Sequence, residues 1–410
     1  MSAHHYDLVI VGGGMVGAAL ACALADSDLR LAIIDARAPD TAFTPDTFDL
    51  RVSAITRASQ HLFENLDAWP GMQARRVTPY QEMRVWDATG RGSIHFSAAD
   101  IGEPDLGHII ENRVILGALT ERLQAAANID LLAPARPLRL QPAHQQPASL
   151  TLADGRQLHA RLIVGADGAR SWVRRQLGID CLGWSYGQKG LVATVRPQHG
   201  HHDTAWQRFL PSGPLALLPL GREHCSIVWS CAEEEAEQLL QLPPDAFLQR
   251  LNQALGDTPL GRIEHSGPRA AFPLRLQHAR SYIGPRVALV GDAAHTIHPL
   301  AGQGVNLGLL DAATLAGRVL ELQQQGRDFG HSLRLRQYQR ARKADNLLMM
   351  ASMDAFKRLF SNDNPLLSRI RNTGLALADA ASPLKHQLMR QAMGLDARLP
   401  QLSQARWHVD

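Results

Sequence analysis

The segment 7–35 limits the fold of this chain more than any other part of its sequence. It opens with Asp7 and the apolar run Leu-Val-Ile-Val at 8–11, and a glycine-rich turn follows at once. A short apolar run of this kind is typical of a strand buried on both faces. Helical character over 18–25 and a second strand over 30–34 complete a strand–turn–helix–strand unit. We therefore predict a parallel α/β sheet in this part of the chain.

The turn of this unit has the spacing G-x-G-x-x-G, formed by Gly12, Gly14 and Gly17, and the second strand ends in Asp35. Gly12 permits the tight turn, Gly14 lets a pyrophosphate approach, and Gly17 lets helix and strand pack closely. A carboxylate about 20 residues further on meets the ribose of an adenosine. Strand, glycines, helix and acid together predict a dinucleotide site, but they do not distinguish FAD from NAD.

A second glycine-rich stretch occupies 287–308. Its short strand is followed by Gly291 and Asp292, and the glycine-rich segment 302–304 opens an apolar helix. Glycines let a ligand approach the backbone, and a helix N-terminus favours negative charge. Because reduced flavin carries negative charge along one edge of its ring, this arrangement suits a flavin, and Asp292 could accept hydrogen bonds from a sugar-like chain. An ordinary tight turn before a capped helix is the alternative.

Two arginines and one Asp-Gly dipeptide carry weaker signals when each is taken alone. Arg51 lies in an otherwise apolar segment, and Arg113 lies in a helix that we expect to begin near 110. Either could be an ordinary surface arginine. Asp167-Gly168 follows a predicted strand, but this dipeptide is common in turns. Its value lies in the order of the motifs, in which the fingerprint is followed by Asp-Gly and then by Gly-Asp.

Taken in this order, the motifs resemble the class A flavoprotein aromatic hydroxylases over nearly the whole chain, and most strongly at 7–35, 49–57, 162–175 and 287–311. The string GDAAHTIHPLAGQGVNLG at 291–308 resembles the ubiquinone-biosynthesis branch of that family. Asp35 departs from the commoner glutamate, which is a conservative change. The resemblance implies an α/β fold, with a Rossmann-like FAD-binding domain of the para-hydroxybenzoate hydroxylase type, an inserted antiparallel β-sheet substrate domain and a helical C-terminal tail.

We expect this architecture to divide the chain into three regions. The expected limits are 1–75, 107–180 and 275–345 for the FAD-binding domain, 76–106 and 181–274 for the substrate domain, and 346–410 for the helical C-terminal region. Trp206, Phe209, Trp229 and Phe272 are scattered among the strand-like runs of the substrate domain. Aromatic residues in a sheet are more often core than ligand wall, so we predict no individual substrate contacts. Residues 233–255 predict one or two amphipathic helices on the outer face of that sheet.

The resemblance also implies roles for individual residues around the cofactor. Asp35 would bind the adenosine ribose, Arg51 and Arg113 would lie beside the flavin, and Asp292 would fix the ribityl chain. The expected cofactor-binding set is Gly12, Gly14, Met15, Val16, Gly17, Asp35, Arg51, Ser53, Arg113, Asp167, Gly168, Gly291, Asp292, Pro299, Gly302, Gly304, Val305 and Asn306.

The chemistry follows from the same resemblance. It implies FAD as the resident cofactor and O2 as co-substrate. Because only one complete fingerprint occurs, a second Rossmann domain is not expected, and NAD(P)H would bind as a transient electron donor. The reduced flavin would react with O2 to give a hydroperoxide and pass one oxygen atom to an electron-rich phenol or quinol ring. Pro299, Gly302 and Gln303 would flank the reactive ring through their backbone. No protein nucleophile is expected, since the cofactor carries the bond chemistry.

Several substrates remain open. Segment 346–360 and the surroundings of Trp206-Gln207 resemble enzymes that act on late, prenylated and methoxylated rings, so the first choice is hydroxylation of a demethoxy-quinol. An earlier prenylphenol hydroxylation is the runner-up. A catabolic hydroxylase of soluble aromatic acids would instead need a carboxylate-binding arginine in the substrate domain. A non-catalytic flavin-binding component of a biosynthetic complex would bind FAD without oxidising NAD(P)H.

Composition excludes several other classes. A net charge of +3 over 410 residues does not favour nucleic acid as a partner. The four cysteines form no C-x-x-C pair, so neither a disulfide framework nor a zinc site is expected. His295 and His298 lack further metal-ligand candidates and are expected to be structural or close to the flavin. The apolar run 8–25 lacks the basic leader of a signal peptide, and no stretch is apolar enough to span a membrane, so we expect a cytoplasmic protein.

The segment 331–410 differs from the rest of the chain in charge. It holds thirteen Lys and Arg against six Asp, whereas the whole chain carries a net charge of only +3. A solvated basic face is the plain reading. The alternative is docking to the inner face of an anionic membrane or to a biosynthetic complex, which would suit a lipid-tailed substrate. The sequence is compatible with an oligomer but does not indicate its size.

Overall fold

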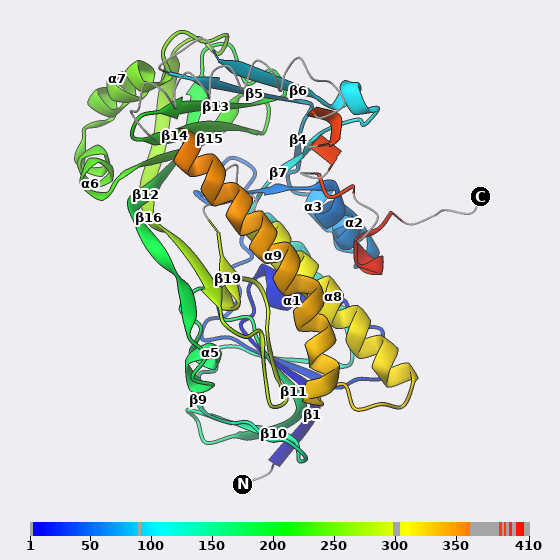
Figure 1. Ribbon diagram of the computed structural model, residues 1–410. Helices are drawn as coiled ribbons and strands as arrows, with labels where there is room; N and C mark the ends of the chain where they lie inside the picture. Colours follow the sequence, from blue (N-terminus) through cyan, green and yellow to red (C-terminus); the bar gives the residue numbers. More distant parts are fainter. Residues whose placement is uncertain are drawn as a thin grey trace.

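The computed structural model describes residues 3–88, 92–297, 304–360, 385–387, 389–390, 393–395 and 399–405. Two eight-stranded sheets and one three-stranded sheet organise this part of the chain. The two longest helices, α8 (Gly304–Gln324) and α9 (Ser332–Phe360), lie side by side, and α9 extends from the first eight-stranded sheet towards the second (Figure 1).

The first eight-stranded sheet contains the predicted parallel core. Its path has the order β17-β18-β11-β1-β2-β8, and β9 and β10 extend it from β11 as antiparallel strands. Leu8, Val9 and Ile10 of β1 are completely buried, which explains why this strand shows no alternation of polar and apolar residues. The strands are β1 (Ala3–Val11), β2 (Leu31–Ile34), β8 (Ile129–Leu132), β9 (Pro137–Gln141), β10 (Ala148–Leu152), β11 (Gln157–Gly165), β17 (Ile283–Gly284) and β18 (Val287–Leu289).

Helices pack on this sheet through small and aliphatic side chains. Helix α1 contacts both α4 and α8, and buried residues of all three helices belong to the core of the first sheet. The other helices of the region are short. Their bounds are α1 (Met15–Cys22), α2 (Arg57–Asn65), α3 (Trp69–Gln73), α4 (Asn112–Ala125) and α5 (Trp172–Gln176).

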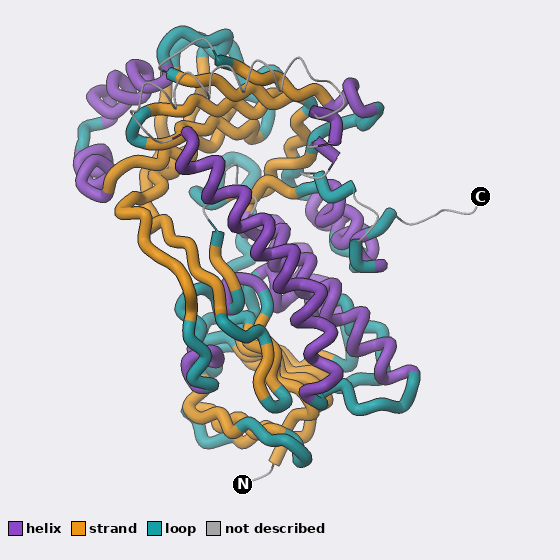
Figure 2. Tube along the Cα trace, viewed as in Figure 1, coloured by secondary structure: helices purple, strands orange, loops and turns teal. Residues whose placement is uncertain are grey.

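The second eight-stranded sheet has the order β19-β16-β12-β15-β14-β13-β5-β6. Its long strands β12 and β16 reach down beside the first sheet, as Figure 2 shows. Every neighbouring pair is antiparallel except β5 and β13, which pair in parallel. No hairpin joins these two strands along the chain, so nothing in their connection forces them to run in opposite directions. The strands are β5 (Glu82–Asp87), β6 (Ser93–Ser97), β12 (Cys181–Pro197), β13 (Thr204–Leu210), β14 (Gly213–Leu220), β15 (His224–Ala232), β16 (Ile263–Ala279) and β19 (His295–Thr296).

The prediction of amphipathic helices over 233–255 is confirmed by α6 (Glu233–Gln241) and α7 (Pro244–Leu255), which pack their apolar faces on this sheet. Three of the scattered aromatic residues are core, as expected: Trp206, Phe209 and Trp229. Phe272 differs, because 41% of its side chain is exposed.

The smaller sheet corrects one prediction. It consists of β3 (Val52–Ile55), β4 (Thr78–Tyr80) and β7 (Gly107–Glu111) in the order β3-β7-β4. We expected a helix from about 110, but β7 continues to Glu111 and α4 begins only at Asn112. The physical reason is pairing, because Ile109 and Ile110 are buried and lie opposite Ala54 and Ser53 of β3.

Several expectations about the C-terminal region meet the limits of the described residues. Helix α9 confirms helical structure at the start of the predicted C-terminal region, and Met350 on it is buried. Most of that region after residue 360 lies outside the described residues. Across the described residues, no helix has both the length and the apolar character that crossing a bilayer requires. The domain limits given above stay a prediction.

Candidate active site

The fingerprint turn lies at the carboxyl end of β1, and two of its glycines are required by space. Gly12 has a φ of 111°, and a Cβ there would lie 2.3 Å from the carbonyl oxygen of Ala166. A Cβ on Gly17 would lie 2.0 Å from the carbonyl oxygen of Gly12. These contacts are far closer than van der Waals distance, so the turn closes against the start of α1 only with glycine at both positions.

Gly14 differs from both, because no atom of the described residues lies within 4 Å of the place where its Cβ would be. It is the N-cap of α1, and no side chain caps the helix there. The free N–H groups at Gly14, Met15 and Val16 can therefore bind an anion, as a pyrophosphate requires. Beside them, Asp35 accepts hydrogen bonds from the N–H of Gly13 at 2.8 Å and of Arg37 at 3.0 Å. This cradle fits the diphosphate and ribose of a dinucleotide.

The second glycine-rich turn meets the first. Gly291 opens the short 3-10 helix η2 (Gly291–Ala293) with a φ of 58°, and a Cβ there would lie 3.2 Å from the side chain of Val16 at the start of α1. The two turns, which are far apart in the sequence, therefore lie against one another and can contact a single ligand from two sides.

Asp292 lies at this junction with Arg51 and Phe272. Its side chain is exposed to solvent, yet enough protein surrounds it that desolvation raises the pKa of its carboxyl group. The charges of His295 and Arg51 act in the opposite direction. The guanidinium of Arg51 lies 5.5 Å from the centre of the Phe272 ring. A carboxylate, a guanidinium and an exposed aromatic ring therefore come together from η2, the start of β3 and β16.

The start of α8 is fixed from below by Asn306. Its buried side chain donates to the carbonyl oxygen of Ala54 at 2.8 Å and accepts from the N–H of Thr56 at 3.2 Å. Val305 packs on the core, and among the described residues the nearest atom to a Cβ at Gly304 would be 3.9 Å away. Within the part of the chain that the structure describes, the backbone at Gly304 is thus open to a ligand. Pro299, Gly302 and Gln303 lie outside the described residues.

Other predicted site residues have their side chains engaged with protein. Ser53 donates to the side chain of Asn112 at 2.8 Å, and Arg113 binds Glu111 and Thr47. Asp167 accepts from Ser171 Oγ at 2.5 Å and from the N–H of Trp172 at 2.6 Å at the start of α5. Gly168 has a φ of 78° and no atom within 4 Å of a Cβ. If Ser53, Arg113 and Asp167 act at a cofactor, they would therefore act indirectly, by positioning the segments to which they bind. Their membership of the cofactor set stays a prediction.

Sequence reasoning missed a buried polar cluster under the second turn. Asp311 of α8 accepts hydrogen bonds from His295 Nε2 at 2.5 Å and from Arg342 Nε of α9 at 2.8 Å. All three side chains are buried. The placement of His295 next to the turn agrees with the predicted structural role. The available signal for Asp311 was an acid on the otherwise apolar face of a long helix, but its partner Arg342 could not be identified without the fold.

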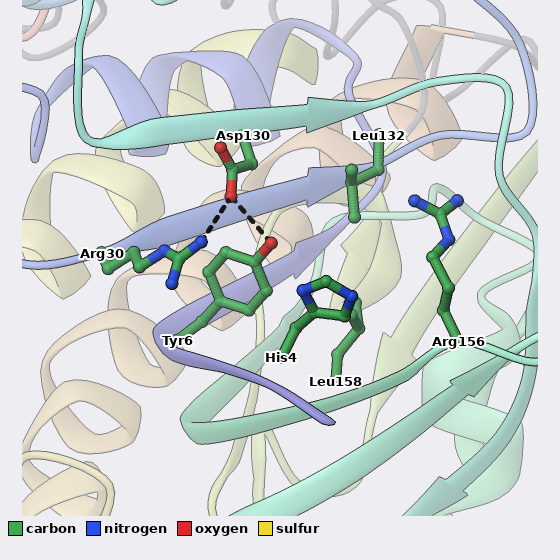
Figure 3. A pocket seen from close by; sticks show the side chains of 7 residues that line it. All are labelled: His4, Tyr6, Arg30, Asp130, Leu132, Arg156 and Leu158. Carbon is green, nitrogen blue, oxygen red and sulfur yellow. Dashed lines mark hydrogen bonds and ion pairs between the residues drawn. The ribbon is translucent and has the colours of Figure 1, made fainter. Parts of the chain in front are cut away.

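A cavity of the protein lies away from the two glycine-rich turns. It has a volume of about 230 Å3 and lies against the early part of β1, and Figure 3 shows its lining residues His4, Tyr6, Arg30, Asp130, Leu132, Arg156 and Leu158. Asp130 there accepts from Tyr6 and Arg30, and burial together with Asp130 raises the pKa of Tyr6 to about 12. None of these residues belongs to either glycine-rich turn, so this cavity is separate from the candidate site. Among the described residues, no cluster of His, Cys, Asp or Glu is placed to hold a metal ion, and all four cysteines are free.

Comparison with known proteins agrees with this geometry. A family model described as an FAD binding domain matches residues 5–350. Ubiquinone hydroxylase UbiL of Rhodospirillum rubrum is 41% identical over 388 residues, which cover 95% of this chain and 89% of that protein. The 3-demethoxyubiquinol 3-hydroxylase of Escherichia coli is 38% identical over 391 residues, which cover 95% of this chain and 98% of that protein.

Solved structures support the fold. PqsL of Pseudomonas aeruginosa, in complex with 2-aminobenzoylacetate, matches with a TM-score of 0.78 at 23% identity over 91% of this chain and 99% of that chain. The p-nitrophenol 4-monooxygenase PnpA of Pseudomonas putida matches with a TM-score of 0.77 at 16% identity over 96% and 99% of the two chains.

The family model and these relatives define the class of this protein as an FAD-dependent monooxygenase. FAD is its cofactor, and NAD(P)H and O2 are the electron donor and co-substrate that this class uses. The chain belongs to the FAD binding domain family and, within it, to the ubiquinone-biosynthesis hydroxylases.

Proposed function

We propose that this protein hydroxylates the aromatic ring of a prenylated demethoxy-quinol, a late intermediate of ubiquinone biosynthesis. The observation that carries the proposal is the 38% identity to the 3-demethoxyubiquinol 3-hydroxylase, which extends over 98% of that enzyme. The alternative within the pathway is an earlier prenylphenol hydroxylation, because another similar protein is named only as a ubiquinone hydroxylase.

The residues at the junction suit this chemistry. FAD, when bound, supplies the redox chemistry that introduces one atom of O2 into the ring. The open N-terminus of α1 and Asp35 would hold its diphosphate and adenosine ribose, and Asp292 would accept hydrogen bonds from its ribityl hydroxyls. Phe272 offers an apolar wall that can pack on a substrate ring and exclude water. Arg51 adds a fixed positive charge next to that wall, which favours the anionic form of a phenol or quinol.

A soluble aromatic acid would need an arginine that binds its carboxylate. Two arginines of the second eight-stranded sheet are engaged on its outer side. Arg208 donates to the carbonyl oxygen of Ala254. Arg269 donates to the carbonyl oxygens of Leu239 and Leu242. These backbone acceptors lie in or directly after α6 and α7. Neither guanidinium is therefore free to bind a substrate carboxylate.

One experiment separates the candidates. The FAD-loaded protein is given NAD(P)H, 18O2 and, in turn, a short-chain prenylated demethoxy-quinol, the prenylphenol precursor and a plain hydroxybenzoate. We expect NAD(P)H oxidation to be stimulated by the demethoxy-quinol, with one 18O atom in a hydroxylated product. Turnover of the prenylphenol alone would support the earlier step, and turnover of the hydroxybenzoate alone would support the catabolic class. FAD binding without stimulated oxidation would identify a non-catalytic component.

We also propose that α9 docks on an anionic membrane surface, where a prenylated substrate resides. Leu333, Arg336, Arg340 and Leu347 are exposed and lie on one side of the helix by their spacing. Apolar and basic side chains on one face are typical of interfacial helices. The wild-type protein should float with anionic vesicles but not with zwitterionic ones, and an Arg336→Glu, Arg340→Glu variant should lose this while retaining FAD. Equal flotation of both proteins, or binding to another protein only, would overturn the proposal.

A further inference from the structure

The carboxylate of Asp311 connects three parts of the protein that are distant in sequence. Its Oδ2 accepts hydrogen bonds from the backbone N–H of Gly291 at 3.0 Å and from His295 Nε2 at 2.5 Å. Its Oδ1 accepts from Arg342 Nε at 2.8 Å and from Asn346 Nδ2 at 3.1 Å. One oxygen therefore faces the second glycine-rich turn, and the other faces α9. An ionised carboxylate has about four acceptor positions, so this one is fully used.

The charge on this carboxylate persists although the side chain is completely buried. Burial alone would raise the pKa of Asp311, but His295 and Arg342 outweigh it and bring the pKa to about 2. A buried, fully bonded ionic cluster contributes little net stability compared with a well-packed apolar one. Such a cluster does impose one specific arrangement on the groups that it joins. For Asp311, the groups that are fixed in this way include the backbone of Gly291.

Gly291 sets the direction of the chain at the second glycine-rich turn. Its φ of 58° is a conformation that turns the chain sharply, and Asp292 follows immediately. The N–H of Gly291 is the only backbone donor of this turn that binds a charged side chain among the described residues, and charge-assisted bonds are the stronger kind. The direction of the Asp292 carboxylate therefore depends on the bond between Gly291 and Asp311.

We propose that Asp311 is a positioning residue for the flavin, acting through Gly291 on Asp292, and that α9 holds Asp311 in place through Arg342 and Asn346. The cluster continues from Asn346 Nδ2 to Tyr282 Oη at 3.3 Å and from Tyr282 to His278 at 3.0 Å. A displacement of α9 would therefore reach the flavin site through two hydrogen bonds. The inference depends on FAD binding alone, so it stands or falls independently of the substrate proposed above.

The test compares substitutions on the two sides of Asp311. Asp311→Asn removes the charge. Asn346→Ala removes the hydrogen bonds of Asn346 to Asp311, Arg342 and Tyr282 but leaves the bond between Gly291 and Asp311 in place. Asp345→Asn is the matched control. Asp345 binds the outer end of Arg342 at 3.1 Å and is exposed, so its loss leaves Asp311 paired. FAD affinity is measured by quenching of flavin fluorescence, the flavin environment by its visible absorption bands, and folding of the FAD-free protein by urea denaturation.

For Asp311→Asn we expect FAD affinity to fall about 10- to 100-fold and the flavin absorption bands to shift. Asn346→Ala should weaken FAD about threefold to tenfold with a shift in the same direction, although Asn346 touches no part of the turn. Asp345→Asn should match the wild type. Wild-type affinity and spectrum in Asn346→Ala would overturn the coupling to α9, even if Asp311→Asn fails to fold. A loss of urea stability with unchanged flavin bands in both variants would show a purely structural role and overturn the proposal.

Discussion

Val16 and Gly308 touch where helices α1 and α8 pass one another. A Cβ on Gly308 would lie 2.7 Å from Cγ2 of Val16 and 3.0 Å from Cα of Gly291. The absence of a side chain on Gly308 thus lets the fingerprint helix, the helix of the second turn and the turn itself come into contact. One flavin can be held at both ends because these three elements are in direct contact.

Gly14, which has open space around it, and Gly17, which is closely packed, should respond differently to substitution by alanine. In Gly14→Ala the new methyl group meets no atom in the part of the chain that the structure describes, so the free energy of unfolding without FAD should change by less than about 0.5 kcal/mol. The methyl group lies where the pyrophosphate approaches, so FAD affinity should fall at least about tenfold. In Gly17→Ala the methyl group would collide with the Gly12 carbonyl, which should lower the free energy of unfolding by about 2 kcal/mol.

Urea denaturation of the FAD-free variants and fluorescence titration with FAD measure both effects. An equal loss of unfolding free energy in the two variants would contradict the assignment of Gly14 to the ligand.

Neutralising Asp292 should have opposite effects on stability and on FAD affinity. Since desolvation raises the pKa of Asp292, its charge is unfavourable in the folded protein without ligand, and Asp292→Asn should leave the stability of that form unchanged or higher. FAD affinity should fall about tenfold, because an amide is a weaker acceptor for the ribityl hydroxyls. The measurements are thermal denaturation without FAD and titration with FAD.

Asp328→Asn is the matched control for Asp292→Asn. Burial acts to raise the pKa of Asp328, but its ion pair with Arg286 lowers it, so this carboxylate stabilises the folded protein. The control should lose stability and keep wild-type FAD affinity. If Asp292→Asn lost stability but kept wild-type FAD affinity, while Asp328→Asn lost FAD affinity, the placement of Asp292 at the cofactor would be refuted.

Asn306→Ala should destabilise the start of α8. The substitution leaves the carbonyl oxygen of Ala54 and the N–H of Thr56 without their partner in a buried place. An unpaired buried backbone group costs about 1–3 kcal/mol, so the free energy of unfolding should fall by about 2 kcal/mol or more. Urea denaturation with saturating FAD checks this value, and a change below about 0.5 kcal/mol would show that the two hydrogen bonds do not anchor the helix.

Stability should fall as pH decreases from 6.5 towards 4. Burial, together with nearby positive charge, lowers the pKa of His108 and of His278 to about 4 from an ordinary value of 6.5. Both histidines are therefore neutral in the folded protein, while the unfolded chain takes up their protons below pH 6.5. The stabilising effect of keeping both histidines neutral is fully present above pH 6.5. When the pH has fallen to 5, each histidine should have lowered the free energy of unfolding by about 2 kcal/mol.

The measurement is the free energy of unfolding from urea titrations between pH 7 and pH 5. His108→Gln and His278→Gln should each flatten the decrease, because glutamine does not titrate. Curves parallel to that of the wild type would mean that folding does not lower the pKa of these two histidines.

Much of the fold could be predicted because its signals are local. The run 8–11 is apolar at every position since β1 is covered on both faces, and glycine spacing marks the turn that follows. The start of α4 was misplaced because apolar residues at 109–110 satisfy a strand as well as a helix. Only pairing with β3 decides between them, and the parallel pairing of β5 with β13 likewise depends on contacts between distant segments.

The sequence by itself determined that two turns in this chain must be built from glycine, and it indicated which carboxylates stand beside them. Tertiary structure alone decided what those turns touch. It brought Gly291 against Val16, turned Arg113 towards Thr47 and Asp167 towards α5, and buried Asp311 between the second turn and Arg342. The physical reason is range: backbone strain and periodicity act between neighbours in the chain, whereas hydrogen bonds and ion pairs of buried side chains join residues whose distance in sequence carries no signal.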